Sequence, residues 1–269
     1  MKLTSIFLKY CLKYFLAFLI VLICCIPIAK LSYKIVEQQV MKMNELKLKE
    51  GVNEIEQNIS KMYLLAQSMS QDLHFDTLIR NKGKLSSSEY LQLGYARQNL
   101  VNTRLIYTFP CFSFMLFRDN DLFVSSSQCS EQFSAYYGKF FKVYDHGLIE
   151  ADKFKSSLLS KNSIYSFWTV DRLEYCLDDK TQILENAILF MVKANSKMTV
   201  STSHVMTFVI QPAELIEMLL TEECRKEGFV QVINTSDGEI LLNYGENAEV
   251  LKDAADKDQV RYGVIPIGF

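Results

Sequence analysis

The feature that most constrains this chain is a membrane-length apolar run close to its beginning. Between residues 10 and 29 the only charged side chain is Lys13, and residues 15–26 carry no charge at all. About twenty apolar residues in a helix are enough to cross the roughly 30 Å hydrocarbon layer of a bilayer. The pattern therefore predicts a transmembrane helix over residues 14–33, with Lys13 near one end, where its amine can reach the headgroups.

A cleaved signal peptide is the alternative interpretation of the same run. Lys2 and Lys9 form a basic start, and residues 20–25 form an apolar segment. The whole run is longer than the roughly 7 to 15 residues usual for the apolar part of a signal peptide. Residues 25–30 also lack a small-x-small cleavage motif. We therefore expect the run to be retained as an anchor.

The lysines around the run say little about its orientation. They are nearly balanced on its two sides, at Lys2, Lys9, Lys13, Lys30, Lys34 and Lys42. The positive-inside rule is therefore almost neutral. Residues 1–13 have no acidic side chain and are too few to fold, so we expect them to form a cytoplasmic tail. The bulk of the chain is then expected to be extracellular, anchored by a single pass through the cell membrane.

Overall charge excludes some classes of partner. The 29 Lys and Arg residues are nearly matched by 31 Asp and Glu residues, for a formal net charge of -2. Nucleic-acid binding favours a clustered basic surface. We therefore expect no direct contact with nucleic acid from this portion. The residues after the apolar run are numerous enough to bury a sizeable core.

The cysteines and histidines do not form a metal-binding motif. Of 7 cysteines, Cys11, Cys24 and Cys25 belong to the apolar run. The remaining four match no zinc spacing, and the three histidines stand far apart in sequence: Cys111, Cys129, Cys176, Cys224, His74, His146 and His204. A metal site would have to be assembled from unrelated segments. We expect neither a metal nor a cofactor.

Two cysteines flank an apparent hairpin whose turn is Arg-Asp-Asn-Asp. A four-residue turn would leave Cys111 and Cys129 within one register step of facing each other. A disulfide between them is one hypothesis, and two free, partly buried thiols are the other.

A helical seam follows the apolar run. Its members recur at alternating steps of three and four, at Val52, Ile55, Ile59, Met62, Ala66, Met69 and Leu73. This period indicates a long helix of about three heptads. An earlier set, Val36, Val40 and Met43, is out of phase with it. The seam predicts a stalk helix over residues 34–80 that packs on its own domain, pairs with a second copy in a homodimer, or does both.

Beyond the stalk the pattern becomes mixed. Ser86 and Glu89 have the spacing of a capping box, which predicts a second helix to about residue 106. Alternating β-rich segments then predict a five-stranded antiparallel sheet, at residues 112–117, 122–126, 165–170, 187–192 and 205–210. The aromatic-rich residues 131–159 favour short helices and loops.

A second, smaller sheet is expected after this one. Pro212 suits the first position of a helix that continues over residues 213–223. Residues 229–233 and 239–242 then form two short strands, joined by an Asn-Thr-Ser-Asp-Gly turn. The fold class is therefore α+β.

This order of segments resembles the extracellular double-Cache (dCache) sensors of membrane-anchored bacterial receptors, which have two PAS-like lobes along one long helix. The matching pieces are the anchor and stalk, CFSFMLFRDNDLFVSSS, MTFVIQPAELIEMLL and GFVQVINTSDGEILLNYG. The resemblance implies a membrane-distal lobe over residues 81–211. It also implies a connecting helix and a partial, incomplete membrane-proximal lobe with antiparallel strands over residues 212–269.

Among such receptors the chain is most similar to the sensor halves of AraC-type membrane transcription regulators. Sensor histidine kinases share the same front half, and an anchored adhesion or assembly module is a third reading. Residues 259–269 resemble a lobe strand, after which no second apolar run, helix-turn-helix pair or phosphoacceptor helix follows. The resemblance therefore implies signal input, and we expect a fragment, a truncated product or a sensor acting through a partner.

Enzymatic motifs are missing from the sequence, which has no G-x-S-x-G, H-E-x-x-H or C-x-x-C. The adjacent acids Asp178–Asp179 and Glu222–Glu223 are typical of solvated turns or helix ends. We expect no catalysis.

Binding of a small extracellular ligand fits the resemblance better. A PAS-like lobe holds its ligand between the sheet and covering loops. Trp168 and Arg172 would share a sheet face if their strand is regular, and Tyr144 and Asp145 lie in the preceding aromatic loop. The resemblance implies an Arg, aromatics and an Asp in this region. The alternative is that Trp168 is a core residue and Arg172 a surface charge.

Overall fold

The computed structural model of the chain describes residues 2–81, 83–106, 109–130, 132–160, 163–177, 180–193, 203–227, 229–234 and 238–245. Two compact units make up the chain, Met1–Leu48 and Lys49–Phe269. Several predicted features lie outside the described residues: the acid pair Asp178–Asp179, the turn residues 235–237 and the last strand at 259–269.

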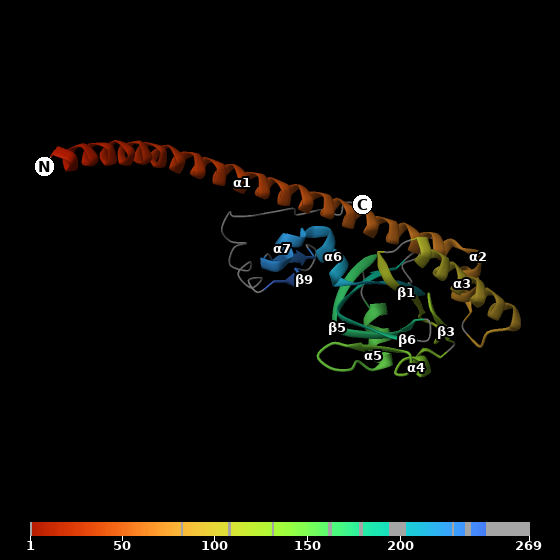
Figure 1. Cartoon of the computed structure of the whole chain (residues 1–269). Helices are drawn as coiled ribbons and strands as arrows, with labels where there is room; N and C mark the ends of the chain where they lie inside the picture. Colours follow the sequence, from red (N-terminus) through yellow and green to blue (C-terminus); the bar gives the residue numbers. More distant parts are fainter. Residues whose placement is uncertain are drawn as a thin grey trace. The chain divides into compact units, whose positions relative to one another are not determined.

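The first unit is the N-terminal part of α1 (Lys2–Gln71), a 70-residue helix that continues into the second unit. Among the described residues α1 is the one helix that is long and apolar enough to cross a membrane, and the side chains of its apolar stretch are exposed. Pro27 lies inside it, as membrane helices tolerate. The predicted apolar helix is thus confirmed (Figure 1).

The second unit is built on a curled antiparallel sheet of seven strands. In spatial order they are β3 (Cys129–Ser130), β2 (Phe123–Ser125), β1 (Pro110–Phe117), β7 (His204–Ile210), β6 (Lys180–Val192), β5 (Tyr165–Leu177) and β4 (Phe141–Tyr144). The five predicted strands are present, and β3 and β4 add one strand at each edge. Together with the helices, this sheet confirms the α+β class.

Both faces of this sheet are buried, each in its own core. Neighbouring residues of a strand point to opposite faces and therefore belong to different cores. In β1, Phe114 and Leu116 join the core shared with α4 (Phe133–Tyr136) and α5 (Ala151–Ser160), which we term the aromatic core. Met115 and Phe117 join the opposite core, shared with α1, α2 (Leu73–Arg80) and α3 (Ser87–Ile106), which we term the helix-side core. Figure 1 shows the two groups of helices on opposite sides of the strands.

The later part of α1 belongs to the helix-side core. Ile59, Met62, Ala66 and Met69 are buried there, which confirms that the stalk seam packs on its own domain. The seam ends earlier than predicted, since Leu73 is 75% exposed. The helix itself ends at Gln71, because the Asp72 carboxylate accepts from the backbone N–H of His74 and caps α2 instead.

The start of α3 is capped as the sequence predicts. The backbone N–H of Ser86 donates to Glu89 Oε2 (2.7 Å), and the Ser86 hydroxyl reaches the same oxygen (2.6 Å). These hydrogen bonds lower the pKa of Glu89. One of the two hydrogen bonds of the predicted capping box is therefore confirmed, whereas the Glu89 N–H donates to the Ser86 carbonyl oxygen and not to its hydroxyl.

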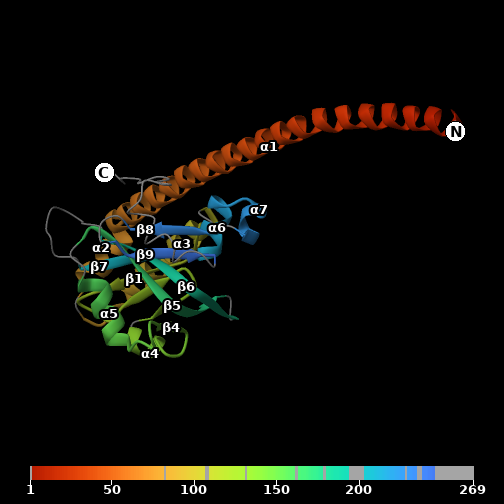
Figure 2. The same cartoon turned by 90° about the vertical axis from the view of Figure 1, so that its left-hand side faces the viewer.

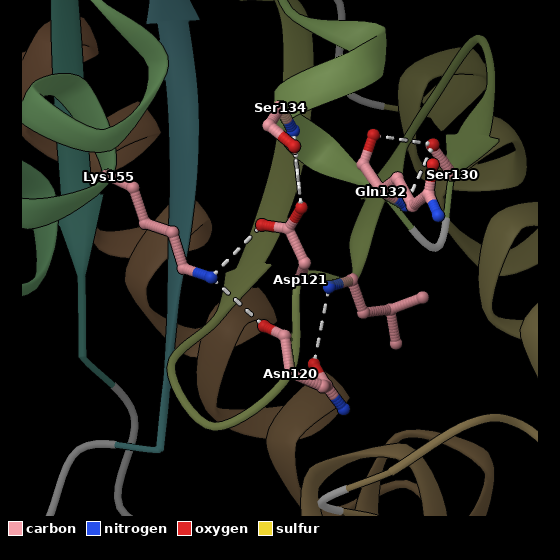
Figure 3. Close-up of polar contacts among 7 residues, drawn as sticks. Asn120, Asp121, Ser130, Gln132, Ser134 and Lys155 are labelled. Atoms are coloured by element: carbon pink, nitrogen blue, oxygen red, sulfur yellow. Dashed lines mark hydrogen bonds and ion pairs between the residues drawn. The ribbon is translucent and has the colours of Figure 1, made fainter.

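The turn between β1 and β2 ties the sheet to its covering helices (Figure 3). Asp121 accepts from the hydroxyl of Ser134 in α4 (3.1 Å) and from the amine of Lys155 in α5 (3.3 Å). The backbone carbonyl oxygen of Asn120 also accepts a hydrogen bond from the Lys155 amine (3.0 Å). The side chain of Asn120 donates in turn to the carbonyl of Asn81, at the end of α2 (2.9 Å).

After β7 come α6 (Pro212–Leu219), α7 (Glu222–Glu227) and a two-stranded sheet of β8 (Val230–Ile233) and β9 (Ile240–Tyr244), which Figure 2 shows beside the large sheet. The single helix predicted over residues 213–223 is wrong. Leu220 is extended, and the Thr221 hydroxyl accepts from the Cys224 N–H, so a new helix begins there. Pro212 opens α6 as predicted.

Candidate functional site

The four predicted ligand-binding residues lie on two neighbouring strands. Tyr144 ends β4 and stands opposite Arg172 of β5 in the antiparallel register. Asp145 follows Tyr144 in the turn, and Trp168 lies four residues before Arg172 on β5. The aromatic-rich region, for which we expected short helices and loops, therefore also contains the edge strand β4, and its pairing with β5 brings the four residues to one edge of the sheet.

Trp168 links the aromatic core to the turn. Its ring stacks on Phe154 of α5, with 5.7 Å between ring centroids. Its indole N–H donates to Asp145 Oδ2 at 3.3 Å. A tryptophan with an apolar body in the core and a polar edge toward a carboxylate can hold that carboxylate in one orientation.

Arg172 belongs to a cluster of surface charges. Its guanidinium lies 5.4 Å from the centroid of the Tyr144 ring, within the range of a cation–π contact. The same group contacts Glu174 Oε1 at 2.7 Å and Glu185 Oε1 at 3.9 Å. The amine of Lys142, on β4, lies 3.6 Å from Oε2 of Glu174, on β5. Arg172 is thus held against a tyrosine and between acids.

The expectation that Trp168 and Arg172 share a face is wrong. Val170 and Leu173 are both buried in the aromatic core although they stand three residues apart, so the alternation of β5 shifts by one between them. Leu184 and Ala187 show the same shift on β6, where Asn186 has a positive φ of 52°. Trp168 therefore faces the aromatic core, whereas Arg172 and Tyr144 face the other way.

Sequence reasoning missed two residues at this turn, His146 and Asp171. The backbone N–H of His146 donates to Asp171 Oδ2 at 2.6 Å, and its ring Nδ1 lies 3.4 Å from the same oxygen. Together with Asp145 they offer three ligand atoms within 4.8 Å of one another. The signal in the sequence was the Asp-His-Gly triplet, which is typical of a turn, but the partner Asp171 becomes visible only with the β4–β5 register.

The interior of the large lobe, where a PAS-like ligand was expected, is filled by aromatic rings. Six phenylalanines of the aromatic core are at most 1% exposed, namely Phe112, Phe114, Phe123, Phe133, Phe141 and Phe154. Their centroids stand 5.3 to 6.5 Å apart in many of the pairs, the usual spacing of packed rings. The candidate site is accordingly at the edge of the sheet, around the turn after β4.

The predicted disulfide pair consists of two free thiols in the structure. Cys111 lies in β1 and Cys129 in β3, and β2 stands between these strands. Burial raises the pKa of the Cys111 thiol to about 11. The thiol donates a hydrogen bond to the carbonyl oxygen of Val209 (3.3 Å). Cys129 is exposed. Of the alternative, two free and partly buried thiols, the partial burial holds for Cys111 and not for Cys129.

Comparison with known proteins adds no family to these observations. Neither the models of protein families nor the sequences of curated proteins contain a match to this chain.

Proposed function

We propose that this chain is the signal-input portion of a membrane-anchored bacterial regulator, a non-enzymatic sensor of a small extracellular ligand. The regulator is of the AraC type, so the chain detects the ligand and a DNA-binding output lies elsewhere. Ligand contact involves Tyr144, Asp145, Trp168 and Arg172, at the edge of the membrane-distal PAS-like lobe. The chain itself touches no nucleic acid.

The observation that carries this proposal is the continuity of α1. One helix, Lys2–Gln71, contains both the exposed apolar stretch and the seam buried against the sheet. A movement of the sheet domain would therefore reach the apolar stretch through covalent, hydrogen-bonded backbone. An anchor joined to its domain by a flexible linker would not have this property.

The candidate site supports the same proposal. On one face of the paired strands Tyr144 and Arg172 offer an aromatic ring and a cation, and Asp145 offers a carboxylate in the adjacent turn, which suits a small polar ligand. Trp168 also joins this turn to the aromatic core through Phe154. A ligand that displaced the Trp168–Asp145 hydrogen bond would act directly on the packing of α5.

A homodimer through the stalk helix is part of the proposal. The seam residues Ile59 and Met62 are buried in their own domain, so they are not free for a partner. The earlier set Val36, Val40 and Met43 is 45 to 56% exposed and keeps the spacing of three and four. The dimer contact therefore uses this earlier set, next to the membrane.

The test is a ligand screen on the full chain in lipid nanodiscs. Amino acids, peptides, sugars and organic acids are added, and the thermal unfolding of the sheet domain is followed. We expect at least one compound to raise the melting temperature, because a ligand that binds the folded state stabilises it. Arg172→Gln and Trp168→Phe should reduce that shift, whereas a change at Lys153, an exposed residue of α5, to Gln should not.

Two other functions remain in competition with the AraC-type sensor. A histidine-kinase sensor would give the same ligand response, and the output segment of the same gene distinguishes them: a helix-turn-helix pair or a His-bearing dimerisation helix. An anchored adhesion or assembly module is favoured if the screen gives no shift with any compound.

A further inference from the structure

The turn after β4 and the adjacent part of β5 form a donor set for a metal ion. Asp145, His146 and Asp171 each offer one ligand atom, and these atoms lie within 4.8 Å of one another. We propose that this turn binds one divalent transition-metal ion through the two carboxylates and the imidazole. The inference goes beyond the proposed function, because an ion here would join β4 to β5 whether or not the chain detects an organic ligand.

The donor types favour a particular class of ion. Calcium and magnesium take oxygen ligands, whereas an imidazole with two carboxylates suits borderline ions such as Zn²⁺ or Fe²⁺, and its two carboxylates also suit the harder Mn²⁺. Metal–ligand bonds of about 2.0–2.2 Å require the donor atoms to approach one another more closely than 4.8 Å. The side chains of His146 and Asp171 are 92% and 54% exposed, so both can rotate to close the site. Solvent reaches the ion and completes its coordination.

A group outside the donor set already orients one ligand. The Trp168 indole N–H donates to Asp145 Oδ2, which leaves the other carboxylate oxygen of Asp145 for an ion. The ring of Trp168 is itself fixed by stacking on Phe154. Metal sites commonly rely on such an outer hydrogen bond, whose loss typically weakens affinity by about 10- to 100-fold.

The neighbouring cations are directed at other acids. Arg172 contacts Glu174 and Glu185, and Lys142 contacts Glu174. The side chains of Asp145 and Asp171 meet the Trp168 N–H and His146 instead. Two carboxylates brought close together without a matching Lys or Arg among these contacts favour a bound cation.

The test uses Mn²⁺ as the probe, because the free thiols of the chain prefer softer ions such as Zn²⁺. Full chain in detergent is stripped with EDTA and titrated with Mn²⁺, and free Mn²⁺ is counted by electron paramagnetic resonance. We expect one tight ion per chain. His146→Ala and Asp171→Asn should each weaken binding more than tenfold, and Trp168→Phe, which keeps a ring but lacks the N–H, by about tenfold.

The matched controls are His74→Gln and Asp152→Asn, one histidine and one aspartate at other places in the second unit. Both should bind Mn²⁺ like the parent chain. Failure to bind Mn²⁺ at millimolar concentration, or equal binding by the parent, His146→Ala and Asp171→Asn, would overturn the proposal. A chain that binds Mn²⁺ here and responds to no organic ligand would refute the sensor proposal and leave the metal site standing.

Discussion

Among single residues, the buried His204 of β7 has a protonation state that is set by its hydrogen-bond partners. It is 1% exposed, and its Nε2 lies 2.8 Å from the hydroxyl of Ser70 in α1. That hydroxyl donates to the Ala66 carbonyl, so the network assigns the proton to Nε2, which donates to Ser70. Nδ1 then accepts from the Ser203 hydroxyl at 3.2 Å. Both nitrogens of a neutral imidazole are satisfied, as in a structural core histidine.

Protonation of His204 should destabilise the second unit. Burial lowers its pKa from 6.5 to about 4, so the unfolded chain binds this proton more readily than the folded chain. The stabilisation is complete above pH 6.5 and is lost as the pH falls toward 4, by up to about 3 kcal/mol. Urea unfolding at several pH values measures this. The His204→Gln variant should lose this part of the slope, and an unchanged slope would contradict the assignment.

At the scale of elements, α1 and α6 are packed unusually closely. A Cβ added at Gly51 of α1 would stand 2.2 Å from the carbonyl oxygen of Met218 in α6. No real side-chain atom fits at that distance, and the obstacle is backbone rather than a flexible side chain. Glycine at position 51 is therefore required by the contact, although it weakens a helix by about 1 kcal/mol relative to alanine.

Alanine at two helical glycines should have opposite effects. Gly51→Ala should lower the free energy of unfolding by about 1–3 kcal/mol, because α6 must move away. Gly94→Ala, on the exposed side of α3 with open space around it, should raise that free energy by up to about 1 kcal/mol. Chemical denaturation of both variants gives the comparison. Equal effects would show that α6 does not rest on α1 at this point.

Elements that follow from a local pattern could be predicted from the sequence, whereas features that depend on pairing between distant strands could not. The apolar helix and the Ser86–Glu89 cap follow from local pattern and were predictable. Strand β4 was not, because its four residues, although they alternate, are too few to stand out in an aromatic-rich stretch. The shift of alternation at Asp171 was also hidden, since it depends on the paired irregularity at Asn186. For this reason the sequence could not show that Trp168 and Arg172 lie on opposite faces of β5.

For the whole molecule, sensing of an extracellular ligand requires the sheet domain to lie outside the cell. The exposed apolar stretch of α1 is bordered by Tyr14, 76% exposed, and Tyr33, 73% exposed. Tyrosines are enriched at both interfaces of a bilayer, and the 19 helical steps from Tyr14 to Tyr33 span about 28 Å of helix. This distance matches the hydrocarbon thickness of about 30 Å. The same reasoning predicts that α1 remains in the membrane after synthesis.

The most direct test is the labelling of Cys129, an exposed free thiol of the sheet domain. Intact cells producing the full chain are treated with a membrane-impermeant maleimide, and a Cys129→Ser variant identifies the signal from this thiol. We expect Cys129 to be labelled before the cells are permeabilised, and the labelled chain to stay in the membrane fraction. Labelling only after permeabilisation, or recovery of the chain as a soluble protein, would contradict this expectation.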